Sequence, residues 1–408
     1  MRSWAIRGFI QQCLRLGGLR FLGALCTLLV NVVLARVLPA EEIGHYFVAL
    51  GIAVFLAQIS TLGSAKLLIK KMAEADAATL SNRVLSAAII LSFLGALGVY
   101  GLFIVLASAF GFAVILPFYV VLGMAWFYIA LAALHGLEAS WVSVAIQYIV
   151  QPVLFLLLAL YAPLNGSLIE LYGLSCVVCL SVVFVMLRSH YHVCFTFAGV
   201  SELPNYARAA LSYLAILTLG LAATHLMLPL ASVWLTHEDV AVIGIVTRIC
   251  NALFYLVVSV RLLLLPKFTK HRQEKQASIA HYAMLGAALP VSGFVLALCV
   301  SLLWHKPILG WFGEGYAQQS FLLLYALLAL APAVVTGWCE SYLLAYSQES
   351  KVLTASILAS CVGFVALVPA VVLFGAVGCL IVMMGMKSLY SLTTGLQVLS
   401  FSKRGVNA

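Results

Sequence analysis

Long apolar stretches separated by short connections fill almost the whole chain, and this pattern leaves few folds open. Windows of about 20 apolar residues, the length that crosses a bilayer as a helix, recur about twelve times. Hydrophobic residues make up 64% of the 408 residues and charged residues only 9%, whereas soluble domains carry roughly a quarter charged residues. The sequence therefore predicts an all-α polytopic membrane protein with about 12 transmembrane helices.

The basic residues lie at the ends of the predicted spans. None of them forms a run that could follow a phosphate backbone, so the formal net charge of +9 does not predict a nucleic-acid partner. Most Lys and Arg residues of the short loops fall on the side that also holds the two chain ends. Because cytoplasmic loops carry an excess of Lys and Arg, we expect both termini to be cytoplasmic.

A connection near the midpoint, residues 191–205, separates six predicted spans from six. It predicts an N-terminal six-helix bundle at 1–190, a cytoplasmic linker at 191–205 and a C-terminal six-helix bundle at 206–408. An even number of spans in each half makes the two pseudo-symmetric bundles parallel repeats. A short echo supports this, since Leu-Ala-x-Val followed by Ile-Gly occurs at both 34–44 and 230–244.

Ionisable and amide side chains inside the predicted spans are candidates for lining a water-filled pathway, because charged groups in lipid are costly. Helical spacing places Arg20 and Asn31 on one face of the first span, and Arg248, Asn251 and Tyr255 on one face of the eighth. Arg248 lies about ten residues inside its span, too deep for its side chain to reach the headgroups easily. We therefore expect these residues to bind substrate.

Three further side chains are candidates with open alternatives. Lys387 lies among polar neighbours in the last span, and His225 in the seventh could carry a proton near neutral pH or simply be hydrogen-bonded. Glu340 is the candidate for binding a coupling proton or sodium ion, but it could equally form a salt bridge with a neighbouring Arg or Lys. Arg20, like Arg261, could instead extend to the cytoplasmic headgroups, and other polar side chains could join helices.

Catalytic and metal-binding patterns are missing from the sequence. It contains no GxSxG, phosphate-loop, HExxH or paired-Asp motif, and no long loop that could carry the acids or histidines of a surface enzyme. Cys176 and Cys179 share a CxxC spacing, but they lie within a predicted span. We therefore expect a protein that is not an enzyme and that binds no metal or cofactor.

The segment RVLPAEEIGHYFVA joins the first two predicted spans. It is similar to the turn that follows the first helix in the Wzx-type polysaccharide and O-antigen flippases of the multidrug/oligosaccharidyl-lipid/polysaccharide superfamily. Degenerate hydrophobic patterns follow in the family's order over almost the whole chain, and they lie at 57–70, 135–138, 265–266, 308–327 and 374–378.

The resemblance implies two six-helix bundles around a central cleft that opens alternately to either side of the bacterial inner membrane. It also implies a cationic lumen for a lipid-linked oligosaccharide, usually on undecaprenyl pyrophosphate. The partners implied are membrane lipids, with a polysaccharide polymerase and a chain-length regulator as further candidates. The chain departs from the family in its few lumenal acids and in Pro229, so the sequence leaves the coupling ion and the gate geometry open.

Two other functions remain as alternatives. A drug or cation exporter of the same superfamily would share the architecture, but we would expect more acidic residues in its lumen. A membrane polysaccharide polymerase or ligase would need a long periplasmic loop with catalytic groups, which the short connections here do not provide. The flippase is therefore the function that the sequence favours.

Overall fold

The computed structural model describes residues 2–73, 78–110, 116–161, 167–196, 200, 202–274 and 279–405. Within these ranges the chain is almost entirely helical and contains no β-strand. The elements follow one another as α1 (Arg2–Val37), α2 (Ala40–Ser60), α3 (Ser64–Ala73), α4 (Ala78–Phe110), α5 (Phe118–Gly136), α6 (Ser140–Ala145), the π-helix η1 (Ile146–Val150), α7 (Gln151–Tyr161), α8 (Leu168–Tyr191), α9 (Leu203–His225), α10 (Met227–Ala231), α11 (His237–Glu274), α12 (Ile279–Gly310), α13 (Glu314–Gln318), α14 (Phe321–Thr336), α15 (Cys339–Ala345) and α16 (Glu349–Gly405).

The described residues include ten segments that are long and apolar enough to cross a membrane. One of these, Glu349–Phe401, is 53 residues long and changes direction at Gly375, whose φ of 56° and ψ of −133° are not helical. Dividing it there and adding the 23-residue helix α9 gives the twelve crossings expected from the sequence. The predicted all-α polytopic membrane fold is confirmed.

The helix breaks directly after the membrane-length segment Ala40–Ser60 and inside the segment Phe321–Ala345. Leu62 and Gly63, which separate α2 from α3, have φ angles of 48° and 81°, a conformation that side chains other than glycine seldom adopt. Residues 337–338 separate α14 from α15. A break of this kind releases backbone groups from the helical ladder, and inside a membrane they need other partners.

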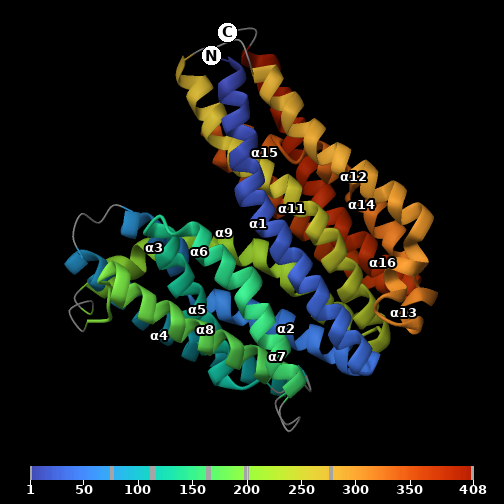
Figure 1. The fold of residues 1–408 in the computed structure, drawn as a ribbon, viewed down its shortest axis with the longest axis horizontal. Helices are drawn as coiled ribbons and strands as arrows, with labels where there is room; N and C mark the ends of the chain where they lie inside the picture. The colour runs from blue at the N-terminus through green and yellow to red at the C-terminus, as the bar shows by residue number, and fades with distance from the viewer. Residues whose placement is uncertain are drawn as a thin grey trace. The chain divides into compact units, whose positions relative to one another are not determined.

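The described contacts divide the chain into two compact units, and we treat each by itself. Unit 1 comprises Met1–His45 and Leu230–Ala408, and unit 2 comprises Tyr46–Pro229. In unit 1, α1 packs along α11, and α14 makes its most extensive contact with α16 (Figure 1). The first helix therefore associates with helices from the second half of the sequence.

Unit 2 is built around α5, which contacts α3, α4 and α8. Most of α5 is buried. A methyl group on Gly123 of α5 would collide with Val177 of α8, and one on Gly173 of α8 would collide with Val120 of α5. Small residues thus let the two helices approach closely, which is a common way for helices to pack in membranes.

The two copies of the sequence echo contact each other inside unit 1. A methyl group on Gly44, at the start of α2, would collide with the backbone carbonyl of His237, the first residue of α11. The rings of His45 and His237 lie next to each other, with centroids 3.6 Å apart. Glycine is therefore required at position 44 for this close approach.

The contact units do not follow the boundaries that the sequence predicts for the two six-helix bundles. Helix α1 belongs to unit 1, whereas α9 contacts α3 and α4 in unit 2. A sequence repeat and a contact unit are different properties, so the bundles at 1–190 and 206–408 stay a prediction. Residues 197–199 and 201 of the predicted linker at 191–205 lie outside the described residues.

Candidate functional site

Most of the polar side chains selected from the sequence lie in unit 1. The exception is His225, the last residue of α9, which belongs to unit 2. Its backbone carbonyl faces Gly51 of α2 so closely that a methyl group there would collide with it. The remaining seven candidates lie on α1, α11, α15 and α16, and they are Arg20, Asn31, Arg248, Asn251, Tyr255, Glu340 and Lys387.

Because α1 packs against α11, the positions of their polar residues along the two helix axes can be compared. Gly44, near the start of α2, contacts His237, the first residue of α11, so depth can be counted from this end of the unit. With a rise of 1.5 Å per residue, Arg20 lies about 25 Å from the end of α1 and Tyr255 about 27 Å from the start of α11. Arg248 and Asn251 lie at about 16 and 21 Å on the same scale.

Arg20 is half-buried, and its Nε atom is a buried donor without an acceptor among the described residues. An unsatisfied buried donor costs about 1–3 kcal/mol, and more when the group is charged. Asn31 is also buried, but its Nδ2 donates to the Thr27 carbonyl at 2.6 Å within its own helix. Among the described side chains of α1, Arg20 is therefore the one with a buried donor that lacks an acceptor.

Lys387 on α16 is held by neutral groups on α11. Its Nζ donates a hydrogen bond to Oδ1 of Asn251, and it lies 5.3 Å from the centroid of the Phe254 ring. An amide oxygen and an aromatic face both attract an ammonium group, but neither cancels its charge. Sequence spacing selected Lys387 and Asn251 separately, and the structure brings them together.

Glu340, the coupling-ion candidate, forms an ion pair with Arg261. Nη1 of Arg261 lies 2.6 Å from Oε2 of Glu340, and both side chains are largely buried. Nε of the same guanidinium donates to the Gly337 carbonyl at 2.7 Å, which lies at the break between α14 and α15. Of the two interpretations that the sequence left open, the structure contains the salt bridge, while a coupling role for Glu340 stays a prediction.

Arg248 turns back along its own helix. Its Nη1 donates to the Gly244 carbonyl at 3.0 Å, and the side chain is partly buried. Tyr255 follows seven residues later on the same helical face and is also partly buried. Arg248 thus combines a partly buried position with a contact to neutral backbone, which resembles the surroundings of Lys387.

Three residues that the sequence did not predict as part of the site contact one another beside Lys387 and Glu340: Phe254, Arg261 and Tyr390. The guanidinium of Arg261 lies 5.5 Å from the Phe254 ring centroid and 5.9 Å from that of Tyr390. A signal was present, since Phe254 and Arg261 are seven residues apart and therefore share a face of α11. The sequence predicts that Arg261 could extend towards the headgroups, whereas in the structure it binds Gly337 and Glu340 inside unit 1.

Four basic side chains of unit 1 lie on α1, α11 and α16, and α11 packs against both other helices. We call these residues, Arg20, Arg248, Arg261 and Lys387, the cationic cluster; Glu340 is the one acid among the candidate residues of the unit. In a region of low dielectric constant, an excess of cations over acids attracts an anion strongly. Within the part of the chain that the structure describes, no three His, Cys, Asp or Glu side chains come together as metal ligands. The chemistry that these side chains favour is the binding of an anion.

Comparison with known proteins gives matches among solved structures alone. No protein-family model matches the chain, and no curated protein sequence matches it. A structure of the lipid II flippase MurJ in an inward closed conformation superposes with a TM-score of 0.76 and 13% identity, covering 94% of this chain and 87% of that one. The chain has the fold of this membrane transporter.

Multidrug transporters share the same fold. An inward-facing multidrug resistance MATE family transporter of the MOP superfamily gives a TM-score of 0.71 and 13% identity, over 93% of this chain and 96% of that one. A MATE protein in complex with MaL6 gives 0.64 and 12% identity, over 96% and 95% of the two chains. The comparisons thus show that the chain shares its multi-pass membrane fold with a lipid flippase and with a multidrug resistance MATE family transporter.

Proposed function

We propose that this protein translocates a lipid-linked oligosaccharide across the bacterial inner membrane, from the cytoplasmic to the periplasmic leaflet. The substrate class is an O-antigen or exopolysaccharide repeat unit on undecaprenyl pyrophosphate. The sugar passes through the protein while the polyprenyl tail stays in lipid, and the six-helix halves at 1–190 and 206–408 alternate in opening. The fold shared with a lipid flippase supports this proposal.

The cationic cluster of unit 1 is the observation that carries the proposal. Arg20 has a buried donor without an acceptor among the described residues, and Lys387 is held by an amide and a ring. Pyrophosphate and acidic sugars accept charge-assisted hydrogen bonds from such groups. We assign Arg20, Arg248 and Lys387 to the anion, and Asn31, Asn251 and Tyr255 to sugar hydroxyls.

The orientation and the remaining partners belong to the same proposal. We place both termini in the cytoplasm because the basic loops lie on their side of the membrane. His225 lies at the end of α9 in unit 2. We propose it as a separate substrate-binding residue. A polysaccharide polymerase and a chain-length regulator would receive the flipped unit on the periplasmic side.

Reconstitution provides a direct test. The purified protein is placed in liposomes that contain a fluorescent oligosaccharide on undecaprenyl pyrophosphate, and a membrane-impermeant glycosidase outside reports when the sugar becomes accessible. The full-length protein should expose the sugar much faster than protein-free liposomes do. Arg248→Ala should slow exposure about 10- to 100-fold, since a hydrogen bond to a charged group contributes about 1.5–3 kcal/mol.

The matched control is Arg208→Ala, which removes an exposed arginine of unit 2. It should transport like the unmodified protein. If Arg248→Ala also transports at that rate while remaining folded in the liposomes, the assignment of the anion site is wrong.

Export of an organic cation is the second candidate, because MATE multidrug transporters share the fold. The cationic cluster of unit 1 argues against it, since like charges repel in a region of low dielectric constant. The same liposomes can be loaded with a fluorescent organic cation. Movement of that cation without movement of the oligosaccharide would contradict the flippase proposal and favour the exporter.

A further inference from the structure

Unit 2 contains an apolar pocket that the proposed transport reaction does not use. Its volume is about 420 Å³, within the range of pockets that bind small molecules. Six side chains from α4, α5, α8 and the segment after α8 line it, and they are Ile89, Ile90, Phe93, Trp126, Phe184 and Phe195. The lining is made of hydrocarbon and aromatic groups, so its occupant should be a hydrocarbon chain.

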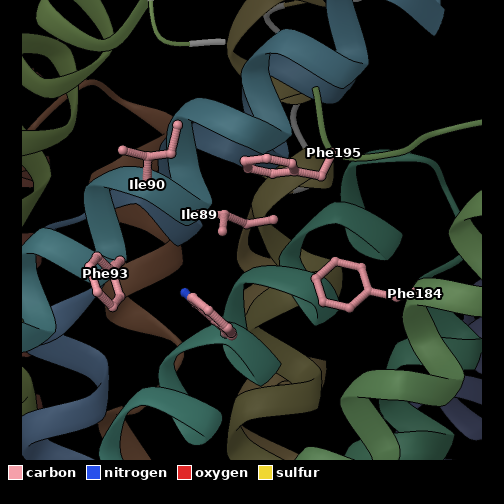
Figure 2. A pocket seen from close by; sticks show the side chains of 6 residues that line it. Ile89, Ile90, Phe93, Phe184 and Phe195 are labelled. Atoms are coloured by element: carbon pink, nitrogen blue, oxygen red, sulfur yellow. The ribbon is translucent and has the colours of Figure 1, made fainter. Parts of the chain in front are cut away.

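Packed helices and a hydrogen-bonded segment fix the walls of the pocket. Figure 2 shows Ile89, Ile90 and Phe93 on one helix, with Phe184 and Phe195 across the space from them. The segment that carries Phe195 is fixed to α4 on both sides. The backbone N–H of Cys194 donates to Oδ1 of Asn82 at 2.8 Å, and that of Thr196 donates to Oγ of Ser86 at 2.7 Å.

Two exposed arginines lie on the helices that line the pocket, a few residues along the chain from lining side chains. Arg83 precedes Ile90 by seven residues on α4, and Arg188 follows Phe184 by four residues on α8. Both spacings return to nearly the same helical face, and they correspond to about 10 Å and about 6 Å along the two helices. Helices α4 and α8 are the third and sixth crossings in chain order and therefore cross in opposite directions. We therefore expect both arginines at the same membrane face.

We propose that this pocket binds an anionic phospholipid of the leaflet on that basic face. One acyl chain enters the apolar pocket, and the phosphate accepts hydrogen bonds from Arg83 and Arg188. Charge complementarity selects this occupant, because guanidinium groups match phosphate in geometry as well as in charge. Neutral phospholipids carry the same chains but lack the net charge that two arginines attract. The proposal does not depend on the transported substrate.

Photocrosslinking of the full-length protein in liposomes tests the site. Phosphatidylglycerol and phosphatidylcholine carrying the same diazirine-labelled acyl chain are compared at equal concentration, and labelled peptides are identified by mass spectrometry. Peptides that contain Ile90 and Phe184 should react with phosphatidylglycerol about tenfold more than with phosphatidylcholine. Equal labelling by the two lipids would show ordinary membrane contact and overturn the proposal.

Variants separate the two parts of the site. Arg83→Gln combined with Arg188→Gln should remove the preference for phosphatidylglycerol while leaving some labelling by both lipids. Ile90→Trp should fill the pocket and reduce labelling by either lipid, whereas the control Leu97→Trp, at an exposed position on α4 outside the pocket, should not. Thermal unfolding of each variant checks that it is folded.

A competition experiment tests the identity of the lipid. Unlabelled polyprenyl phosphate is added at the same concentration as the labelled phosphatidylglycerol, and labelling of the Phe184 peptide is followed. Labelling should persist if the pocket prefers a phospholipid. Displacement by equimolar polyprenyl phosphate would overturn the proposal and assign the pocket to a polyprenyl chain. The oligosaccharide exposure assay is independent of this readout, so the two proposals can fail separately.

Discussion

Two cations of unit 1 contact the same aromatic ring, Phe254, but their other partners differ. Arg261 is paired with the carboxylate of Glu340 and also binds the Gly337 carbonyl. Lys387 donates to the Asn251 side-chain amide. The charge of Arg261 is therefore balanced by a carboxylate, whereas the contacts of Lys387 with Asn251 and Phe254 are with neutral groups.

This difference separates a structural from a functional role for buried charge. Arg261 supplies a donor to a carbonyl at the break between α14 and α15, where the helical ladder is interrupted. Its ion pair with Glu340 also joins α11 to α15. Lys387 carries a positive charge within a membrane-length helix, where the Asn251 amide and the Phe254 ring orient its ammonium group but do not neutralise it. We expect substitution at the two positions to affect different properties of the protein.

The largest effect is expected from Arg261→Met. The substitution leaves Glu340 as a buried charge without its partner and removes the donor to the Gly337 carbonyl. Loss of one partner of a buried ion pair typically lowers the free energy of unfolding by about 3–5 kcal/mol. Chemical unfolding of the purified protein in detergent measures this difference.

Its control is the double variant Arg261→Met with Glu340→Gln, which removes both charges. It should recover much of the lost stability, because no uncompensated charge remains. Glu340→Gln alone also tests the coupling hypothesis. If Glu340 carries a coupling ion, this variant loses the response of transport to a proton or sodium gradient; if Glu340 serves only the ion pair, that response is unchanged and stability falls.

A smaller effect, on binding and not on stability, is expected from Lys387→Met. Removing a partly buried ammonium group relieves desolvation, so the free energy of unfolding should stay the same or rise. Affinity for an oligosaccharide on undecaprenyl pyrophosphate should fall about 10- to 100-fold through loss of a charged hydrogen bond. Equilibrium binding in detergent measures the affinity, and Lys387→Arg should retain part of it. Unchanged affinity in Lys387→Met would remove this residue from the anion site.

The sequence predicted the all-α membrane fold, whereas the candidate site stays a prediction. Apolar length alone indicates spans, and 3.6-residue periodicity placed Arg248, Asn251 and Tyr255 on one face of α11. Periodicity cannot say which helix lies opposite that face. The lipid and the protein interior are both apolar, so hydrophobicity does not distinguish the packed side of a span from its lipid side. The contact of α1 with α11 therefore had no signal in the sequence.

Contacts that depend on helix breaks and on the segments between helices also could not be predicted from the sequence. Arg261 and Gly337 are 76 residues apart in the chain, and their hydrogen bond exists because the helix ends near Gly337. The apolar pocket of unit 2 depends on Phe195, whose place is set by hydrogen bonds of its neighbours to Asn82 and Ser86. Local sequence patterns carry no information on such pairings, which arise when distant segments meet.

The smallest effect is expected from Phe254→Leu, which removes the ring that both cations contact. A cation–π interaction contributes roughly 0.5–2 kcal/mol, so we expect modest losses of unfolding free energy through Arg261 and of substrate affinity through Lys387. Phe254→Tyr keeps the ring and should retain both properties. A loss of stability alone would assign the ring to the ion pair, whereas a loss of affinity alone would assign it to the anion site. If neither property changes, the ring does not stabilise either cation, and the comparison between Arg261 and Lys387 rests on Glu340 and Asn251 alone.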